Sequence, residues 1–191
     1  MDSINYAKYY DLESYLFNEV SPRFHRENML GAQDFFCIII WKANRAKSKI
    51  AKRLLKHGPY SDLDTAVRTL THEIWSADNP KARLSVLINE WGFYLPMASA
   101  ILTVLFPQDF SVYDVRVCEV LGDFQDAQYK KFERLWERYL QYLERVRGEV
   151  PHIENLRDKD RYLWAKSFYL GLARDVQNQF KKTSPNTEDA Q

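Results

Sequence analysis

The sequence predicts an all-α protein with seven or eight helices, and three observations support this prediction. Apolar residues recur at helical spacing through most of the 191 residues. No alternating apolar and polar run stands between Asn-Gly or Asp-Gly turns, so nothing indicates β-hairpins. Glycine is scarce, with 6 in the chain, and Gly or Pro stands where most periodic segments begin or end. The length suits one domain with a sizeable buried core.

The first three helices are predicted from their apolar spacing and from the residues that end or open them. The first covers residues 6–19 and ends at Ser21-Pro22, because proline disrupts a helix interior. The second is long, covers residues 34–56 and stops at the Gly-Pro pair that follows it. Ser61 then precedes Asp64 by three residues, which is typical of a capping box that opens the third helix.

The later helices are predicted from similar signals. Their starts and stops are, in chain order, Asn79-Pro80 and Gly92, Pro96 and Phe106-Pro107, and Asp114 and Gly122. Two long amphipathic helices follow, over residues 132–146 and 156–180. The mixed charges at residues 157–161 predict an exposed helix start, and the polar tail 183–191 is expected to be disordered. We therefore expect a single helical domain over residues 1–182.

The composition excludes several classes of protein. The 46% of hydrophobic and 28% of charged residues are typical of a globular protein and exclude wholesale disorder. No apolar run approaches the roughly 20 residues of a membrane span, and the N-terminus lacks a signal pattern, so a cytoplasmic protein without membrane contact is expected. The only cysteines, Cys37 and Cys118, cannot build a tetrathiolate zinc site, and the four histidines do not cluster, so no metal site is expected.

One segment carries unbalanced positive charge although the net charge is only +1. Residues 42–56 include seven Lys or Arg residues, and no acidic residue lies between Asp34 and Asp62. On one continuous helix, six of these cations fall within an arc of roughly 100°: Lys42, Arg45, Lys49, Lys52, Arg53 and Lys56. Such a face can follow a phosphate backbone. The alternative is a solvated face that acids from elsewhere neutralise.

Residues 80–122 have the order helix, tight turn, helix, loop and aspartate. The turn is Gly92-Phe93-Tyr94, small residues follow early in the next helix, and Asp114 comes 22 residues after Gly92. This segment resembles the helix–hairpin–helix DNA glycosylase superfamily, in particular bacterial proteins with an 8-oxoguanine DNA glycosylase fold. The resemblance is close over about 43 residues and extends loosely over the remaining helices.

The resemblance implies a helix–hairpin–helix glycosylase fold and a hydrolase that removes a damaged or modified base from double-stranded DNA. Asp114 is the implied catalytic residue, because a carboxylate stabilises positive charge on the sugar and helps to activate water once the base has left the stack. Gly92, Tyr94 and Pro96 would hold a backbone phosphate with the hairpin's N–H groups and the helix dipole, and Arg116 would add a phosphate contact.

The resemblance implies no organic cofactor, and a monovalent cation at the hairpin carbonyls is the one ion it suggests. No protein partner is indicated. Base excision in DNA repair and attack on modified phage DNA in phage defence both remain open.

Two departures from the family pattern shape the predicted activity. Bifunctional members carry a lysine in the hairpin helix, and the matching position here is Pro96, which favours a monofunctional enzyme. The second glycine of the usual Gly-x-Gly hairpin is Tyr94. The alternative function is a catalytically silent helix–hairpin–helix module for DNA binding or protein interaction, in which Asp114 is only a helix N-cap. A third reading is a helical scaffold without a nucleic-acid partner, which acids covering the cationic segment would support.

Several aromatic residues are candidates for stacking on an everted base, since every base presents a π-face. They are Tyr113, Phe35, Trp41, Trp164 and Phe168. The alternative for each of them is packing in the hydrophobic core.

Overall fold

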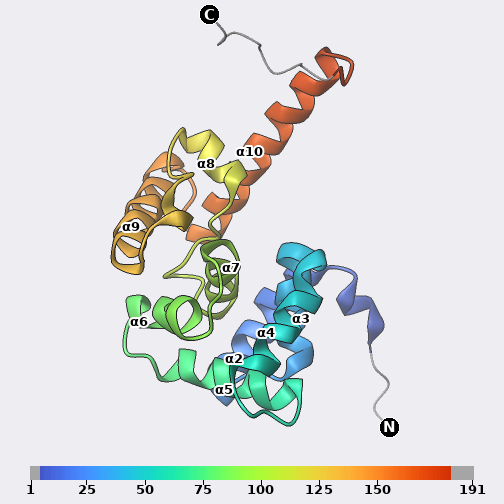
Figure 1. The fold of residues 1–191 in the computed structure, drawn as a ribbon. Helices are drawn as coiled ribbons and strands as arrows, with labels where there is room; N and C mark the ends of the chain where they lie inside the picture. Colours follow the sequence, from blue (N-terminus) through green and yellow to red (C-terminus); the bar gives the residue numbers. More distant parts are fainter. Residues whose placement is uncertain (1–4, 182–191) are drawn as a thin grey trace, which may run out of the picture.

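A computed structural model of the chain describes residues 5–181, which contain helices and no strand (Figure 1). The helices are α1 (Leu12–Tyr15), α2 (Ser21–Glu27), α3 (Ala32–Ala43), α4 (Lys47–His57), α5 (Leu63–Ser76), α6 (Pro80–Ser85), α7 (Leu95–Leu105), α8 (Val115–Leu121), α9 (Phe132–Glu149) and α10 (Leu156–Gln177). Short π or 3-10 turns join some of them, so that eight helical runs are counted within the described residues. The all-α prediction is confirmed.

The first predicted helix boundary is wrong, because the chain stays helical through Ser21-Pro22. A π turn over Leu16–Val20 joins α1 directly to α2. The N–H of Ser21 therefore donates to the carbonyl of Leu16, five residues back, and Pro22 lies in the first turn of α2. Pro22 has no N–H to donate, and it comes directly after the π turn, where the regular hydrogen bonding to the fourth residue back is already interrupted. The run ends at Asn28, which has a left-handed conformation.

The predicted helix over residues 34–56 is two helices. Ala43 leaves the helical region (φ −161°, ψ 86°), a 3-10 turn covers Asn44–Ala46, and α4 begins at Lys47. The apolar spacing continues across this break, since Ile39 and Ile50 lie about 20° apart on an ideal helix, which is why the sequence predicts one rod. As a result, Lys42 belongs to α3, and the other five cations follow the break.

Most of the remaining boundaries agree with the sequence. Pro96 lies in the first turn of α7, and Gly122 closes α8 with a positive φ of 69°. The N-cap of α5 is Asp62 rather than Ser61, because the Asp62 carboxylate accepts from the N–H of Thr65 at 2.8 Å.

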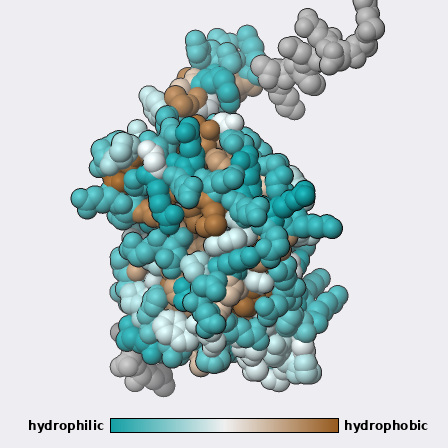
Figure 2. All heavy atoms as spheres, turned by 90° about the vertical axis from the view of Figure 1, so that its left-hand side faces the viewer, coloured by the Kyte–Doolittle hydropathy of each residue, from teal (hydrophilic) through white to brown (hydrophobic). Residues whose placement is uncertain are grey.

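Helix α7 forms the centre of the fold. All of its residues except Pro96 are buried, and it packs against α2, α3 and α6 (Figure 1). Helices α8, α9 and α10 pack on one another, and the C-terminal half of α10 extends away from the rest of the molecule (Figures 1 and 2). The predicted tail 183–191 lies outside the described residues. Within residues 5–181, no helix is long and apolar enough to cross a membrane.

Candidate active site

Asp114 caps α8 and is held from both sides of its carboxylate. Its Oδ1 accepts from the backbone N–H of Arg116 at 3.0 Å, and its Oδ2 forms an ion pair with Nζ of Lys42. The loop before Asp114 is fixed as well, because the N–H of Tyr113 donates to Oγ of Ser99 at 2.9 Å. The predicted N-cap is therefore confirmed, and the carboxylate has a rigid position.

The surroundings of Asp114 favour its ionised form. Burial raises the pKa of this carboxyl, but the ammonium of Lys42 and the hydrogen bonds from Lys42 and Arg116 together hold it below its usual value. The side chain is 20% exposed, so the charge remains accessible from one side. Near neutral pH, Asp114 is thus a hydrogen-bond acceptor and a negative charge, and it cannot donate a proton.

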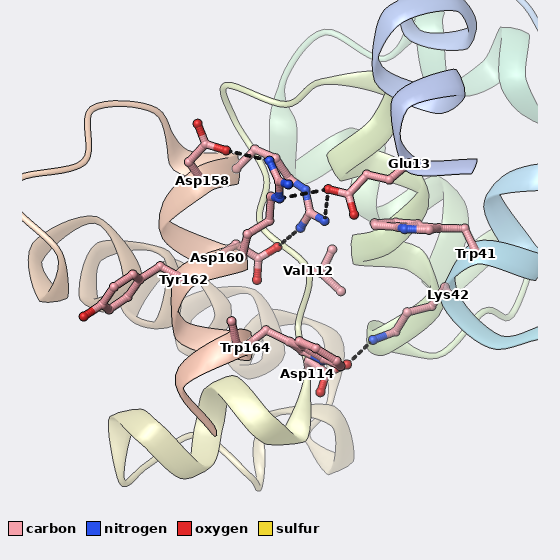
Figure 3. A pocket seen from close by; sticks show the side chains of 12 residues that line it. Glu13, Trp41, Lys42, Val112, Asp114, Asp158, Asp160, Tyr162 and Trp164 are labelled. Carbon is pink, nitrogen blue, oxygen red and sulfur yellow. Dashed lines mark hydrogen bonds and ion pairs between the residues drawn. The ribbon is translucent and has the colours of Figure 1, made fainter. Parts of the chain in front are cut away.

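A pocket of about 660 Å³ opens in front of this ion pair (Figure 3). Its walls come from α1, from the end of α3, from the loop before α8 and from the first turns of α10. The lining residues are Glu13, Trp41, Lys42, Val112, Asp114, Arg157, Asp158, Asp160, Arg161, Tyr162, Trp164 and Ala165. This volume lies in the range of small-molecule sites. The fold thus joins Asp114 with Trp41 and Trp164, which the sequence could only name separately.

A network of charges connects α1 with α10 along one wall of the pocket. Arg157 donates to Glu13 at 2.8 Å and forms a second ion pair with Asp160. Arg161 pairs with Glu13 at 3.2 Å and with Asp158 at 3.1 Å. This network forms one wall of the pocket and links two parts of the chain that are more than 140 residues apart.

Asp160 is the residue that the sequence analysis missed. The helix start at 157–161 was expected to be exposed, yet Asp160 is only 2% exposed. Burial raises the pKa of its carboxyl to about 6, although the positive charges of Arg157 and Lys42 oppose this rise. A signal was present, because Leu156, Asp160 and Leu163 follow one another at helical spacing on the buried face of α10.

The other aromatic candidates lie outside the pocket. Phe35 is fully buried in the core, and Tyr113 is 3% exposed and donates its hydroxyl to the carbonyl of Phe124 at 2.6 Å. Their positions give no support to a role in base stacking. Phe168 does not line this pocket and stacks on Trp164, with parallel rings whose centroids are 5.7 Å apart. The guanidinium of Arg116 stands 5.4 Å from the centre of the Trp164 ring.

The hairpin between α6 and α7 lies beside α4. Gly92 has a positive φ of 67°, as its place in a tight turn predicts. Arg53 covers it so closely that a Cβ at Gly92 would lie 2.7 Å from Nη1 of Arg53. The ring of Tyr94 is flanked by Arg53 at 5.7 Å and by Nζ of Lys49 at 5.8 Å. The fold therefore brings two separately predicted DNA-binding elements, the cationic segment and the hairpin, to one place.

Five of the six cations that follow Ala43 make up what we call the cationic face. Lys49, Lys52, Arg53 and Lys56 lie at helical spacing on one side of α4, and Arg45 lies in the turn before it. Four of them are exposed and Arg53 is partly buried. None of the five has an ion-pair partner among residues 5–181. Acids of the described chain therefore do not neutralise this face, whereas Lys42 is paired.

Within the described residues, no group of three or more His, Cys, Asp or Glu side chains is arranged to hold a metal ion. Cys37 and Cys118 are both buried and free. The monovalent cation at the hairpin stays a prediction.

Comparison with known proteins finds no relative of this chain. No protein-family model, no curated protein sequence and no solved structure matches the chain. The resemblance to the glycosylase superfamily therefore stays a prediction from the sequence of residues 80–122.

Proposed function

We propose that this protein is a monofunctional DNA glycosylase, which hydrolyses the N-glycosidic bond of a damaged or modified base. The observation that carries the proposal is Asp114, an ionised carboxylate with a fixed position on the wall of a pocket that two tryptophans also line. This combination suits a base that has left the DNA stack and a sugar that gains positive charge.

In the proposed reaction, the everted base enters the pocket and stacks against Trp41 or Trp164. The bond from the base to C1′ breaks, and its electron pair leaves with the base. Asp114 stabilises the positive charge that develops on the sugar and orients a water molecule. The water oxygen then bonds to C1′, and the proton that this water releases is balanced by the proton that the departing base takes up.

The cationic face and the hairpin would hold the DNA backbone. The unpaired cations of the cationic face can neutralise phosphates, and the N-terminus of α7 presents backbone N–H groups next to Gly92 and Tyr94. Lys42 lies in the pocket and Lys49 lies at the hairpin, so a short stretch of chain joins the two regions. This arrangement speaks against a helical scaffold that has no nucleic-acid partner.

A catalytically silent DNA-binding module is the second candidate. It is favoured by one observation, namely that both carboxylate oxygens of Asp114 already have partners in Lys42 and in the N–H of Arg116. A purely structural N-cap would look the same.

The test is an excision assay on duplexes that carry a panel of oxidised, deaminated, alkylated and hypermodified bases, followed by alkaline cleavage of abasic sites. We expect strand breaks with the native protein and a loss of at least about 100-fold in rate with Asp114→Asn, which keeps an acceptor at the N-cap. Asp109→Asn, on the same loop and 46% exposed at its side chain, is the matched control and should keep full activity.

Salt-sensitive DNA binding without strand breaks on any base would refute the glycosylase and favour the catalytically silent DNA-binding module. Trapping with borohydride is a second check, because it captures a Schiff base between a lysine and the sugar. A covalent adduct that forms with the native protein and not with Lys42→Arg would show that the amine of Lys42, and not water, attacks the sugar.

A further inference from the structure

The part of α10 that extends from the body is apolar on all sides. Residues 168–173 are Phe-Tyr-Leu-Gly-Leu-Ala, and successive side chains of a helix point 100° apart, so this segment is apolar around its whole circumference. All of these residues except Gly171 are exposed, and the exposed fraction reaches 70% at Tyr169. A helix that is apolar all round is normally buried. This segment therefore lacks a cover among residues 5–181.

A groove of about 710 Å³ lies between this segment and α8. Its apolar lining includes Val115 of α8 and Phe168 and Leu172 of α10. Gly171 lines the groove as well, and a Cβ at Gly171 would meet no atom within 4 Å. A protruding leucine and an open space thus lie next to each other along the same groove, which is the arrangement that two copies of one surface need in order to interlock.

The charged residues of the groove are balanced in sign. Arg116 and Glu119 come from α8, and Arg174 and Asp175 come from α10. None of the four forms an ion pair with any of residues 5–181. A surface with both signs can pair with a second copy of itself, because a twofold axis sets each residue of one protomer against a different residue of its partner. A partner of one sign would neutralise only half of these charges.

Two other occupants fit less well. Residues 182–191 contain no large hydrophobic side chain, so they offer no apolar surface to cover the segment. A lipid bilayer would cover one side of a helix that lies on it, whereas this segment is apolar on every side. The groove and the balanced charges therefore favour a second copy of the chain.

We propose that two copies pair through this groove, with their α10 helices antiparallel about a twofold axis. Leu172 of one protomer enters the open space at Gly171 of its partner, and Arg174 of one protomer reaches Glu119 of its partner. One alignment permits both contacts. It sets position 172 against 171 and therefore 174 against 169, about 3 Å along the helix from Ser167. The hydroxyl of Ser167 donates to Glu119 at 3.0 Å, so Glu119 lies within reach of the partner's Arg174.

The first measurement is the mass of the full chain in solution. We expect light scattering after gel filtration to give twice the 22.7 kDa of one chain at about 100 μM, and the mass should fall towards one chain on dilution. A single chain at every concentration would overturn the inference.

Two glycine variants test the face. Gly171→Met fills the space that Leu172 of the partner would enter, and self-association should weaken at least about tenfold. Gly148→Met is the matched control, because Gly148 also lies within a helix and a Cβ there would also meet no atom within 4 Å. Methionine is a better helix former than glycine, so both variants should fold. A dimer that survives Gly171→Met would overturn the proposed interface.

Charge reversal tests the alignment. Glu119→Arg or Arg174→Glu alone sets like charges against each other and should weaken the dimer, whereas the two changes in one chain should restore it. A double variant that stays as weak as the single ones would overturn this alignment. The inference does not rest on the glycosylase, and no measurement uses DNA. A dimer without excision would keep it and refute the enzyme, and excision by a monomer would do the reverse.

Discussion

Lys42 and Lys49 are seven residues apart in the sequence, yet they lie in opposite electrostatic surroundings. Lys42 lies in the last turn of α3, is 14% exposed at its side chain and pairs with Asp114. Lys49 follows the break, is exposed, and has the ring of Tyr94 as a neighbour but no acidic partner in the described chain. Two lysines of one charged segment thus differ in their partners, because a short irregular turn separates them. Lys42 neutralises Asp114 in the pocket, whereas Lys49 has no acid beside it among the described residues.

The two lysines should differ most clearly when each ammonium is removed in turn. Lys42→Met leaves the carboxylate of Asp114 mostly buried without its counter-charge, and we expect a loss of roughly 2 kcal/mol in the free energy of unfolding. Lys49→Met should change it by less than about 0.5 kcal/mol, because an exposed lysine without a partner contributes little. Urea unfolding of both variants measures the difference. Equal effects would show that the two lysines are equivalent.

The buried carboxyl of Asp160 should also affect how the stability of the protein depends on pH. Burial raises the pKa of Asp160 to about 6 in the folded protein, whereas an unfolded aspartate titrates near 3.8. As the pH falls from 7 to 4, the folded state takes up this proton first, so Asp160 contributes a gain of the order of 2 kcal/mol. The gain is lost again as the pH rises through 6.

Asp160→Asn cannot take up this proton, and its stability should therefore fall more steeply than that of the native protein over the same pH range. Denaturant unfolding at several pH values provides the measurement. Parallel curves for the two proteins would mean that Asp160 titrates normally.

The smallest expected effect concerns the cationic face. Lys49→Gln together with Arg53→Gln should weaken binding to an undamaged duplex about tenfold at moderate salt, and the slope of log K against log salt should become shallower by about two. Lys42→Gln is the comparison, and it should leave the slope unchanged because Lys42 is engaged with Asp114. A slope that responds equally to all three positions would place Lys42 on the DNA as well.

The parts of the structure that the sequence predicts correctly depend on local signals. Asn79, Pro96 and Gly122 mark helix ends through their own backbone preferences, and the N-cap at Asp114 is formed with the N–H of Arg116 two residues later. No distant contact is needed to recognise any of these features.

The parts of the structure that the sequence does not predict depend on partners far along the chain. The ion pair of Lys42 with Asp114 joins residues 72 positions apart, and no spacing rule indicates it. The break after Ala43 is hidden because the apolar period runs on through it. Asp160 was the avoidable omission, since its place between Leu156 and Leu163 on one helix face indicates burial.

The irregular turn over Asn44–Ala46 also has a consequence for how the chain can vary. In an unbroken helix, each inserted residue would rotate everything beyond it by 100° and would turn α4 away from the hairpin. A turn between two helices absorbs a change of length without such a rotation. Lengthening or shortening it can therefore alter how the cationic face approaches a ligand while Lys42 stays in register with Asp114.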